Sequence, residues 1–225
     1  MTKKAEIIGS HFPTIYLTVI SLLQGIALSQ LVPNLISFFE LSKSPLTDLR
    51  ILPLLLMLFV IFIVWHHYAI GIFFLRWFPN IIDTILPFLI SLGQFILISL
   101  ITIDTAIQDM NVTSWTMGFA AFVLLGSLAY FSAAWRLDPP LFNNLMSLEN
   151  AEEHCRRAKN FYMWAGISIL FQGLYGFLIV LVGQPALLLG SLIFFILHLI
   201  LSEYFQLHNL KPHFMRAMDE FDEIV

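Results

Sequence analysis

The stretch FVIFIVWHHYAIGIFFLRWFPNIIDTILPFLIS, residues 59–91, decides the fold. It consists of two apolar runs joined by a very short connection, and it contains the polar side chains of His66, His67, Arg76, Asn80 and Asp83. An ionised side chain at the centre of a membrane helix costs about 2.5 to 3.5 kcal/mol on insertion scales, so such groups usually face protein or water. We therefore expect this helical hairpin to line the interior of a membrane protein.

The composition of the whole chain also indicates a membrane location. Of the 225 residues, 59% are hydrophobic and 12% are charged, and the mean hydropathy is +0.85. A soluble domain has about 45 to 50% apolar and about 25% charged residues. The net charge is −4 and no basic cluster occurs, so nucleic acid is not an expected partner, since binding phosphates requires concentrated Lys and Arg. The single cysteine, Cys155, cannot form an internal disulfide.

The length and the hydropathy pattern predict an all-α, polytopic helix bundle. A membrane span needs about 20 apolar residues, so the chain has room for six spans in one domain, residues 1–225, and for no separate soluble domain. The segment after the fourth span pairs Glu152 with Arg156 and Glu153 with Arg157 at a spacing of four, which predicts a solvated helix. The predicted spans are about 12–39, 51–74, 81–103, 113–134, 161–182 and 186–205, with a cytoplasmic helix at 147–160 and an amphipathic tail at 212–225.

The distribution of basic residues predicts the orientation. With six spans, nine of the eleven Lys and Arg residues fall on the side that holds both termini. Only Lys43 and Arg50 fall on the other side. Because cytoplasmic loops carry the excess of basic residues, we expect both termini to be cytoplasmic. The expected location is the cell membrane, which is the cytoplasmic membrane in a bacterium, with the lipid bilayer as the first partner.

Eight polar side chains are expected to converge in the cytoplasmic half of the bundle, because the predicted spans bring them to similar depths. Three interpretations of this buried polar cluster are open. It can be structural, with Asp83 paired to Arg76 or Arg136, or the histidines and Glu203 can line an aqueous vestibule and set its pH response. It can also be a metal or hydrolytic site. The cluster comprises His66, His67, Arg76, Asn80, Asp83, Arg136, His198 and Glu203.

The residue spacing speaks against the third interpretation. No H-E-x-x-H motif occurs, and His66 and His67 are adjacent, so on a helix they point about 100° apart. Glu203 follows His198 by five residues rather than by three or four, which is a poor spacing for two ligands on one helix. We therefore predict no metal, no cofactor and no enzymatic activity.

Small residues recur along the first predicted span. Ser21, Gly25 and Ser29 are spaced four apart, with Gln24 and Ile26 beside them. A small-xxx-small stripe of this kind lets a neighbouring helix approach closely. These five residues form the predicted pore or packing face.

Three stretches resemble the six-helix potassium channel family of bacterial membranes and lysosomes. They are LLQGIALSQLV (22–32), FVIFIVWHHY (59–68) and NIIDTILPFLIS (80–91), where Trp65, a following histidine, Asn80 and Pro87 match the family pattern. The resemblance implies a six-helix unit that assembles around a central pore lined by the first helix, with Ile26 and nearby apolar positions at the constriction. The family's Phe-Ser-Asp signature is replaced here by Leu22-Leu23-Gln24, which removes the acidic charge.

Two functions are consistent with these patterns. The first is a homo-oligomeric ion channel or permeation protein, favoured by the small residues of the first span and by the resemblance. The alternative is a non-conducting membrane subunit or sensor, in which the charged helix at 147–160 and the tail at 212–225 recruit a cytoplasmic protein partner.

Overall fold

The computed structural model describes residues 3–44, 48–75, 81–101, 112–142 and 146–222. In these ranges the chain is helical and contains no strand, which confirms the all-α prediction. The long helices are α1 (Lys3–Leu41), α2 (Ile51–Leu75), α3 (Ile81–Ser99), α4 (Val112–Arg136), α5 (Leu148–Val182) and α6 (Leu188–Phe205). Shorter elements are η1 (Pro139–Phe142), η2 (Pro185–Leu187), the π-helical η3 (Gln206–Leu210) and α7 (Lys211–Asp222).

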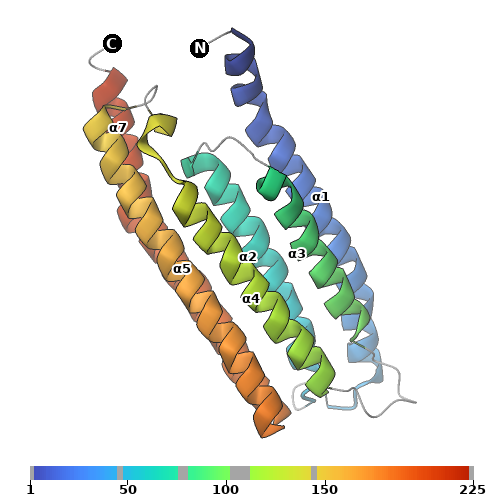
Figure 1. Cartoon of the computed structure of the whole chain (residues 1–225). Helices are drawn as coiled ribbons and strands as arrows, with labels where there is room; N and C mark the ends of the chain where they lie inside the picture. Colours follow the sequence, from blue (N-terminus) through green and yellow to red (C-terminus); the bar gives the residue numbers. More distant parts are fainter. Residues whose placement is uncertain (1–2, 45–47, 76–80, 102–111, 143–145, 223–225) are drawn as a thin grey trace.

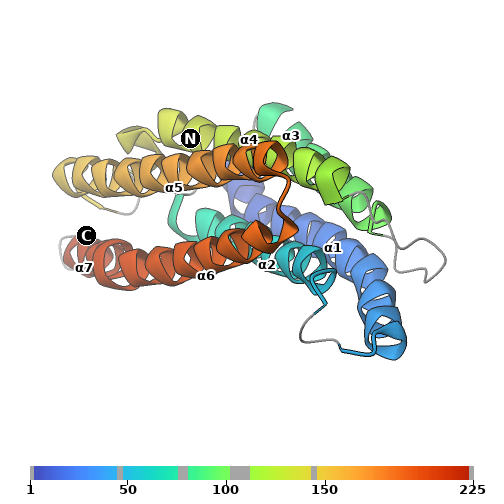
Figure 2. The same ribbon diagram turned by 90° about the horizontal axis from the view of Figure 1, so that it is seen from below.

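The helices form two layers. In Figure 2, α3, α4 and α5 lie in one layer, and α1, α2 and α6 lie in the other. Neighbouring helices contact each other within each layer, and the pairs α1–α3 and α5–α6 connect the two layers. α1 begins and α7 ends at the same end of the bundle (Figure 1). The last turns of α1, α3 and α5 and the first turns of α2, α4 and α6 lie at the opposite end.

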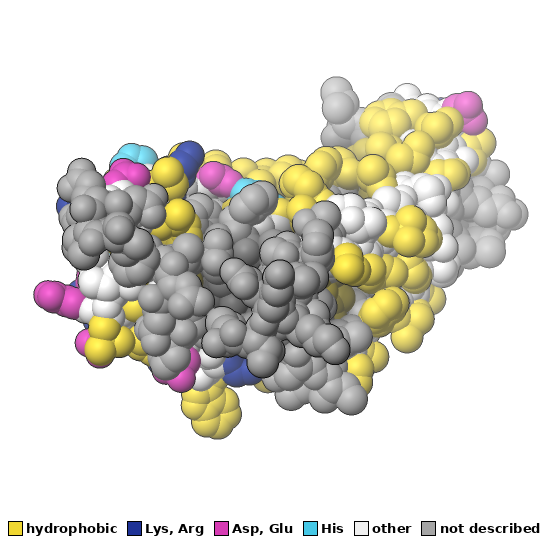
Figure 3. All heavy atoms as spheres, turned by 90° about the horizontal axis from the view of Figure 1, so that it is seen from above, with side chains coloured by type: hydrophobic (Ala, Val, Ile, Leu, Met, Phe, Trp, Pro, Cys, Tyr) yellow, Lys and Arg dark blue, Asp and Glu magenta, His cyan; other side chains and the backbone are white. Residues whose placement is uncertain are grey.

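Five helical segments of the described chain are long and apolar enough to cross a membrane: Ile15–Leu41, Ile51–Gly71, Ser114–Arg136, Leu148–Val182 and Leu188–Asp219. The third predicted span, 81–103, is represented by a shorter apolar helix, Ile85–Ser99. Large apolar side chains cover much of the bundle surface, while acidic, basic and histidine side chains gather toward one part of the view in Figure 3. An apolar outer surface on long helices is the arrangement that a lipid bilayer requires.

α4 and α5 pack closely along a stripe of glycines on α5. Gly173 lies so near α4 that an added Cβ would be 2.6 Å from a Leu124 methyl group and 3.3 Å from the Ala120 carbonyl oxygen. A Cβ on Gly176 would be 2.8 Å from the Ala120 Cβ. Small residues at these positions let the two helix backbones approach, and the close approach increases van der Waals contact. We call these three glycine and alanine positions, with Leu124, the α4–α5 seam.

The predicted cytoplasmic helix at 147–160 and the fifth span at 161–182 form one continuous helix, α5. The Ser147 hydroxyl caps its start by accepting a hydrogen bond from the Asn150 backbone amide at 3.3 Å. Glu153 contacts Arg156 and Arg157, both at 2.6 Å. These two ion pairs lie within one helix and stabilise its charged part. α5 ends at Gly183, whose positive φ of 71° favours glycine.

The predicted tail also continues the preceding span, since α6, η3 and α7 follow one another without a break. Pro212 lacks a backbone donor, and the wider π turn directly before it lets the chain continue as helix. The apolar face of α7 is covered by its own chain. Phe214 and Ala217 pack against Phe142, Met146, Ala151 and Cys155 at the end of the bundle where α5 begins.

Candidate functional site

Two buried histidines from different helices meet in the core. His67 of α2 is 7% exposed and His198 of α6 is 1% exposed, and their ring centroids are 5.5 Å apart. The Nδ1 atom of His67 is hydrogen-bonded to the Tyr130 hydroxyl of α4. The Nδ1 atom of His198 lies 3.0 Å from the Ser168 hydroxyl of α5. Each ring is therefore fixed through one nitrogen, and four helices contribute to the site.

Aromatic side chains hold these two rings in place. The indole of Trp164 is parallel to the His198 ring, with an interplanar angle of 3° and a centroid distance of 5.4 Å. The Phe161 ring meets the His67 ring edge to face, with a centroid distance of 6.0 Å. Stacking and edge-to-face contacts restrict ring rotation. The Nε2 atoms of both histidines are buried and have no hydrogen-bond partner among the described residues.

His66 lies at the rim of this site. Its Nε2 atom is 2.6 Å from the Glu203 carboxylate of α6, a distance at which a protonated His66 forms an ion pair. The His66 Nε2 atom has no hydrogen-bond partner among the described residues, so the contact with Glu203 is electrostatic. The Glu203 side chain is 41% exposed and the His66 side chain is 24% exposed. The adjacent histidines thus occupy a half-exposed rim and a buried core, as their rotation along the helix requires.

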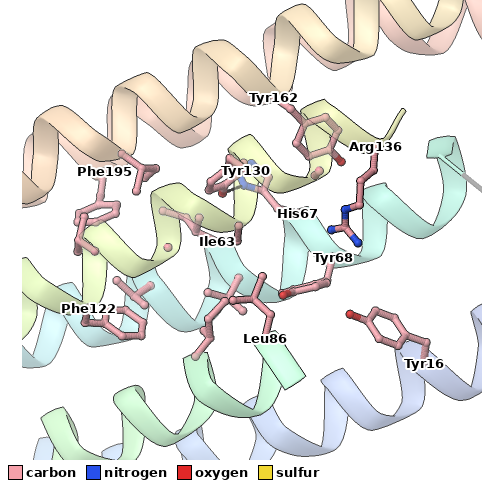
Figure 4. Close-up of a pocket in the computed structure, with 18 residues that line it drawn as sticks. Tyr16, Ile63, His67, Tyr68, Leu86, Phe122, Tyr130, Arg136, Tyr162 and Phe195 are labelled. Carbon is pink, nitrogen blue, oxygen red and sulfur yellow. Dashed lines mark hydrogen bonds between the residues drawn. The ribbon is translucent and has the colours of Figure 1, made fainter. Parts of the chain in front are cut away.

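A cavity of about 90 Å³ adjoins His67. Its walls come from α1 to α6, and its lining is mostly apolar. Figure 4 shows Phe122 and Phe195 toward one end, with Tyr16, Tyr68, Tyr162 and Arg136 toward the other. The polar end faces the same end of the bundle as Arg136, which is where α4 ends.

Buried amides occur away from the histidines. Gln94 of α3 donates a hydrogen bond of 3.1 Å to the Gln24 side-chain oxygen of α1, and both residues are buried. Gln172 of α5 is 1% exposed, and neither its side-chain nitrogen nor its oxygen has a hydrogen-bond partner among the described residues. These amides extend the buried polar groups beyond the cytoplasmic half that the sequence indicates.

The structure brings together five of the eight residues of the buried polar cluster. His66, His67, His198 and Glu203 form the contacts described above, and Arg136 lines the cavity while its Nε donates to the Ser132 carbonyl oxygen. Arg76, Asn80 and the Asp83 side chain lie outside the described residues, so an Asp83 pair with Arg76 or Arg136 stays a prediction. No group of three His, Cys, Asp or Glu side chains suited to a metal occurs in the described part of the chain.

Sequence reasoning missed the residues that fix the histidines. Tyr130, Ser168 and Trp164 are ordinary membrane-helix residues in isolation, and their role depends on which helices are neighbours. A signal existed on α6, where Ser202 and Gln206 follow His198 at intervals of four and share its buried face. That periodicity marks a polar stripe on an otherwise apolar helix.

Only Gln24 of the predicted pore or packing face is buried inside the chain. Ser21, Gly25, Ile26 and Ser29 lie on the outer surface of α1. A Cβ on Gly25 would meet nothing within 4 Å, so no helix among the described residues packs against the stripe at this position. The Ser21 hydroxyl accepts a hydrogen bond of 3.1 Å from the exposed indole of Trp65, and the Ser29 hydroxyl donates to the Ile26 carbonyl oxygen.

The long apolar helices and the apolar outer surface identify the chain as a multi-pass membrane protein of the helical class. No family model matches the sequence, and no curated protein or solved structure matches it either.

Proposed function

We propose that the chain is a homo-oligomeric permeation protein, in which copies of α1 meet at a central axis. The observation that carries this proposal is the outward position of Ser21, Gly25 and Ser29, with open space beside Gly25. Small residues allow two helices to approach closely and so increase van der Waals contact between them. Small residues that face lipid gain no such contact with another helix. A second copy of the same helix supplies a fitting surface, and closed symmetry then places α1 around an axis.

The resemblance to six-helix potassium channels supports the same assembly, because that family places its first helix at the pore. In this chain Ile26 is 40% exposed and Leu22 is 63% exposed, one turn apart on the outer surface of α1. Apolar side chains at an axis form a constriction that gates by excluding water. The permeant species is proposed to be a small cation, and the membrane is proposed to be the cell membrane, with both termini in the cytoplasm.

The test combines the mass of the detergent-solubilised protein with cation flux in liposomes. Gly25→Leu places a bulky side chain on the proposed axis, so it should both reduce the oligomer to smaller species and lower the flux. Ser99→Leu is the matched control, since Ser99 is exposed on α3 and its hydroxyl bonds only within its own helix, to the Phe95 carbonyl oxygen. A monomeric wild-type protein, or wild-type liposomes without flux between pH 5 and 8, would contradict the proposal.

A second candidate is the non-conducting subunit or sensor. It is favoured by the part of α5 that lies beside α7 at the end of the bundle where both termini lie (Figure 1), because this part carries exposed charges, including Glu149, Glu152 and Arg156. Because α7 packs on α5, deleting the tail would uncover apolar surface, so surface charge is the better target. Glu149→Lys with Glu152→Lys should abolish binding of a soluble partner and leave cation flux unchanged. If the wild-type protein conducts and binds no partner, this candidate fails.

A further inference from the structure

The cavity of about 90 Å³ has a charged end and an apolar end. On α4 its lining residues run from Phe122 to Arg136, a distance of about 21 Å along the helix. The Nε atom of Arg136 donates a hydrogen bond of 3.0 Å to the Ser132 carbonyl oxygen, which brings the guanidinium back along α4 by about one turn. From the level of Ser132 to Phe122, the cavity is therefore about 15 Å long.

Hydrogen-bonding groups from several helices gather at the charged end. Figure 4 shows the guanidinium of Arg136 directed toward the space between Tyr162 of α5 and Tyr68 of α2, and all three residues line the cavity. Tyr16 of α1 lines the same end, and its ring centroid is 6.0 Å from that of Tyr68. A guanidinium offers parallel N–H donors that match the two oxygens of a carboxylate, and phenolic hydroxyls can donate to the same oxygens.

Small and apolar residues line the rest of the cavity. Gly126, Ala129 and Ala133 follow one another along α4 at spacings of three and four, and they share the face that lines the cavity. Because their side chains are small, they leave space between α4 and α2. Among the described residues that line the cavity, Arg136 is the only Lys, Arg, Asp or Glu. The charge of the lining therefore favours an anion at one end, and the apolar surface favours hydrocarbon along the remainder.

The volume of the cavity decides the length of hydrocarbon that fits. A water molecule needs roughly 10 to 15 Å³ of cavity space, so about 90 Å³ holds roughly six to nine groups of that size. A methylene group is similar in size to a water molecule, and unlike water it needs no polar neighbours. Spread along about 15 Å, this space fits one extended chain, and it is too narrow for the two acyl chains of a bilayer phospholipid.

We propose that the cavity binds a medium-chain fatty-acid anion of about eight carbons, with its carboxylate at Arg136 and its chain directed along α4 toward Phe122 and Phe195. The guanidinium and the tyrosine hydroxyls of the charged end hold the carboxylate. Each methylene group that is buried strengthens binding about fourfold, up to the length that the cavity accepts. The site lies inside one copy of the chain and does not depend on assembly around α1.

The test is equilibrium dialysis of radiolabelled ligands against the full chain in phosphatidylcholine nanodiscs, with the uptake of empty nanodiscs subtracted. Octanoate should bind to one site per protomer. 1-Octanol has the same chain without the charge and should bind about tenfold more weakly, the low end of what a hydrogen bond to a charged group contributes. Dodecanoate should bind no more tightly than octanoate, because the cavity has no space for four further methylene groups. These three comparisons use the wild-type protein alone.

Two variants separate the charge from the space. Arg136→Gln should weaken octanoate binding about tenfold and leave 1-octanol binding unchanged. Gly126→Leu should abolish binding of both ligands, because its Cβ would meet Ile169 at an ordinary contact of 3.9 Å and the rest of the side chain would occupy the cavity. The matched controls are Arg156→Gln, which removes an exposed charge from α5, and Ser99→Leu, which places leucine on the outer surface of α3. Both controls should bind octanoate as the wild type does.

Thermal unfolding provides a second measurement and shows which variants are folded. A ligand that binds only the folded state raises its stability, so octanoate should raise the Tm of the wild type and leave that of Gly126→Leu unchanged. Absence of octanoate binding, or equal binding of octanoate and 1-octanol, would overturn the proposal. Tighter binding of dodecanoate, or wild-type octanoate binding in a folded Arg136→Gln or Gly126→Leu, would place the ligand elsewhere and overturn the proposal as well.

Discussion

The chain contains two stripes of small residues, and the structure uses them differently. The α4–α5 seam places Gly173 and Gly176 directly against Ala120, so this stripe packs against another helix of the same chain. On the outer stripe of α1, a Cβ added at the central Gly25 would meet no atom of the described chain within 4 Å, and the Ser21 hydroxyl accepts a hydrogen bond from Trp65 of α2. Small residues three or four apart on a helix therefore identify surfaces suited to close packing, but they do not identify the helix that packs there. The neighbour is decided by the rest of the bundle.

The sharpest test of this contrast is a large side chain in the seam. Gly176→Leu would force its Cβ into the 2.8 Å space beside the Ala120 Cβ, and relief would require the two backbones to separate. Overpacking of this kind typically costs about 1 to 3 kcal/mol and occasionally more, and the backbone contact places this site at the upper end. Thermal unfolding of the detergent-solubilised protein should show a clearly lower Tm. An unchanged Tm would mean that α4 and α5 are not held at this distance.

The inner face of α1 gives the next largest effect. Gln24→Leu removes the acceptor of the Gln94 amide, which then stays buried with an unpaired donor. Leaving a buried polar group unpaired costs about 1 to 3 kcal/mol. The double variant Gln24→Leu and Gln94→Leu should recover much of the lost stability in the same unfolding measurement. Additive losses in the double variant would show that the two amides do not interact.

The turn after α1 should respond to pH. The guanidinium of Arg50 and its hydrogen bonds hold the pKa of the Asp48 carboxyl at about 2, below its ordinary value of 3.8. Because this pKa is lowered by folding, the contribution to stability is complete above about pH 4 and is lost as the pH falls toward 2. This partly exposed pair contributes about 1 kcal/mol at most. In a plot of Tm against pH, Asp48→Asn should remove the fall in Tm that Asp48 causes below about pH 4. If the variant shows the same fall as the wild type, another group is responsible for it.

The outer stripe of α1 should give the smallest effect on folding. Gly25→Leu meets open space, so the free energy of unfolding of a dispersed protomer should change by no more than about 0.5 kcal/mol. The comparison with Gly176→Leu uses the same substitution at two small-residue stripes. A large loss of stability at Gly25 in the dispersed protein would mean that another part of the chain covers this face.

Much of the bundle could be predicted from hydropathy alone. The predicted spans at 51–74 and 113–134 agree with α2 and α4 within two residues at each end, because their apolar runs are bounded by charged or proline-containing segments. The boundary near residue 160 could not be predicted in this way. Hydropathy falls between Glu149 and Lys159, but the helix continues because its charges pair along it and its apolar face packs on α7.

Part of the candidate site could be predicted from the sequence. Depth along predicted spans placed His66, His67, His198 and Glu203 at one level, and the structure brings them into contact. The side chains that orient them, Tyr130 and Ser168, depend on which helices adjoin α2 and α6. That adjacency follows from packing of the whole bundle, where small residues on α4 and α5 set the spacing, and no single segment encodes it.

The continuity of α5 has a mechanical consequence. A helix of 35 residues is about 52 Å long, which exceeds the thickness of the membrane core by roughly 20 Å. Such a rod acts as a lever, so a tilt of a few degrees within the bilayer displaces its solvent end by several ångströms. Because α7 packs against that end of α5 through Phe214 and Ala217, α5 and α7 would move together. A spectroscopic label on the solvent end of α5 would then report motion that originates inside the membrane.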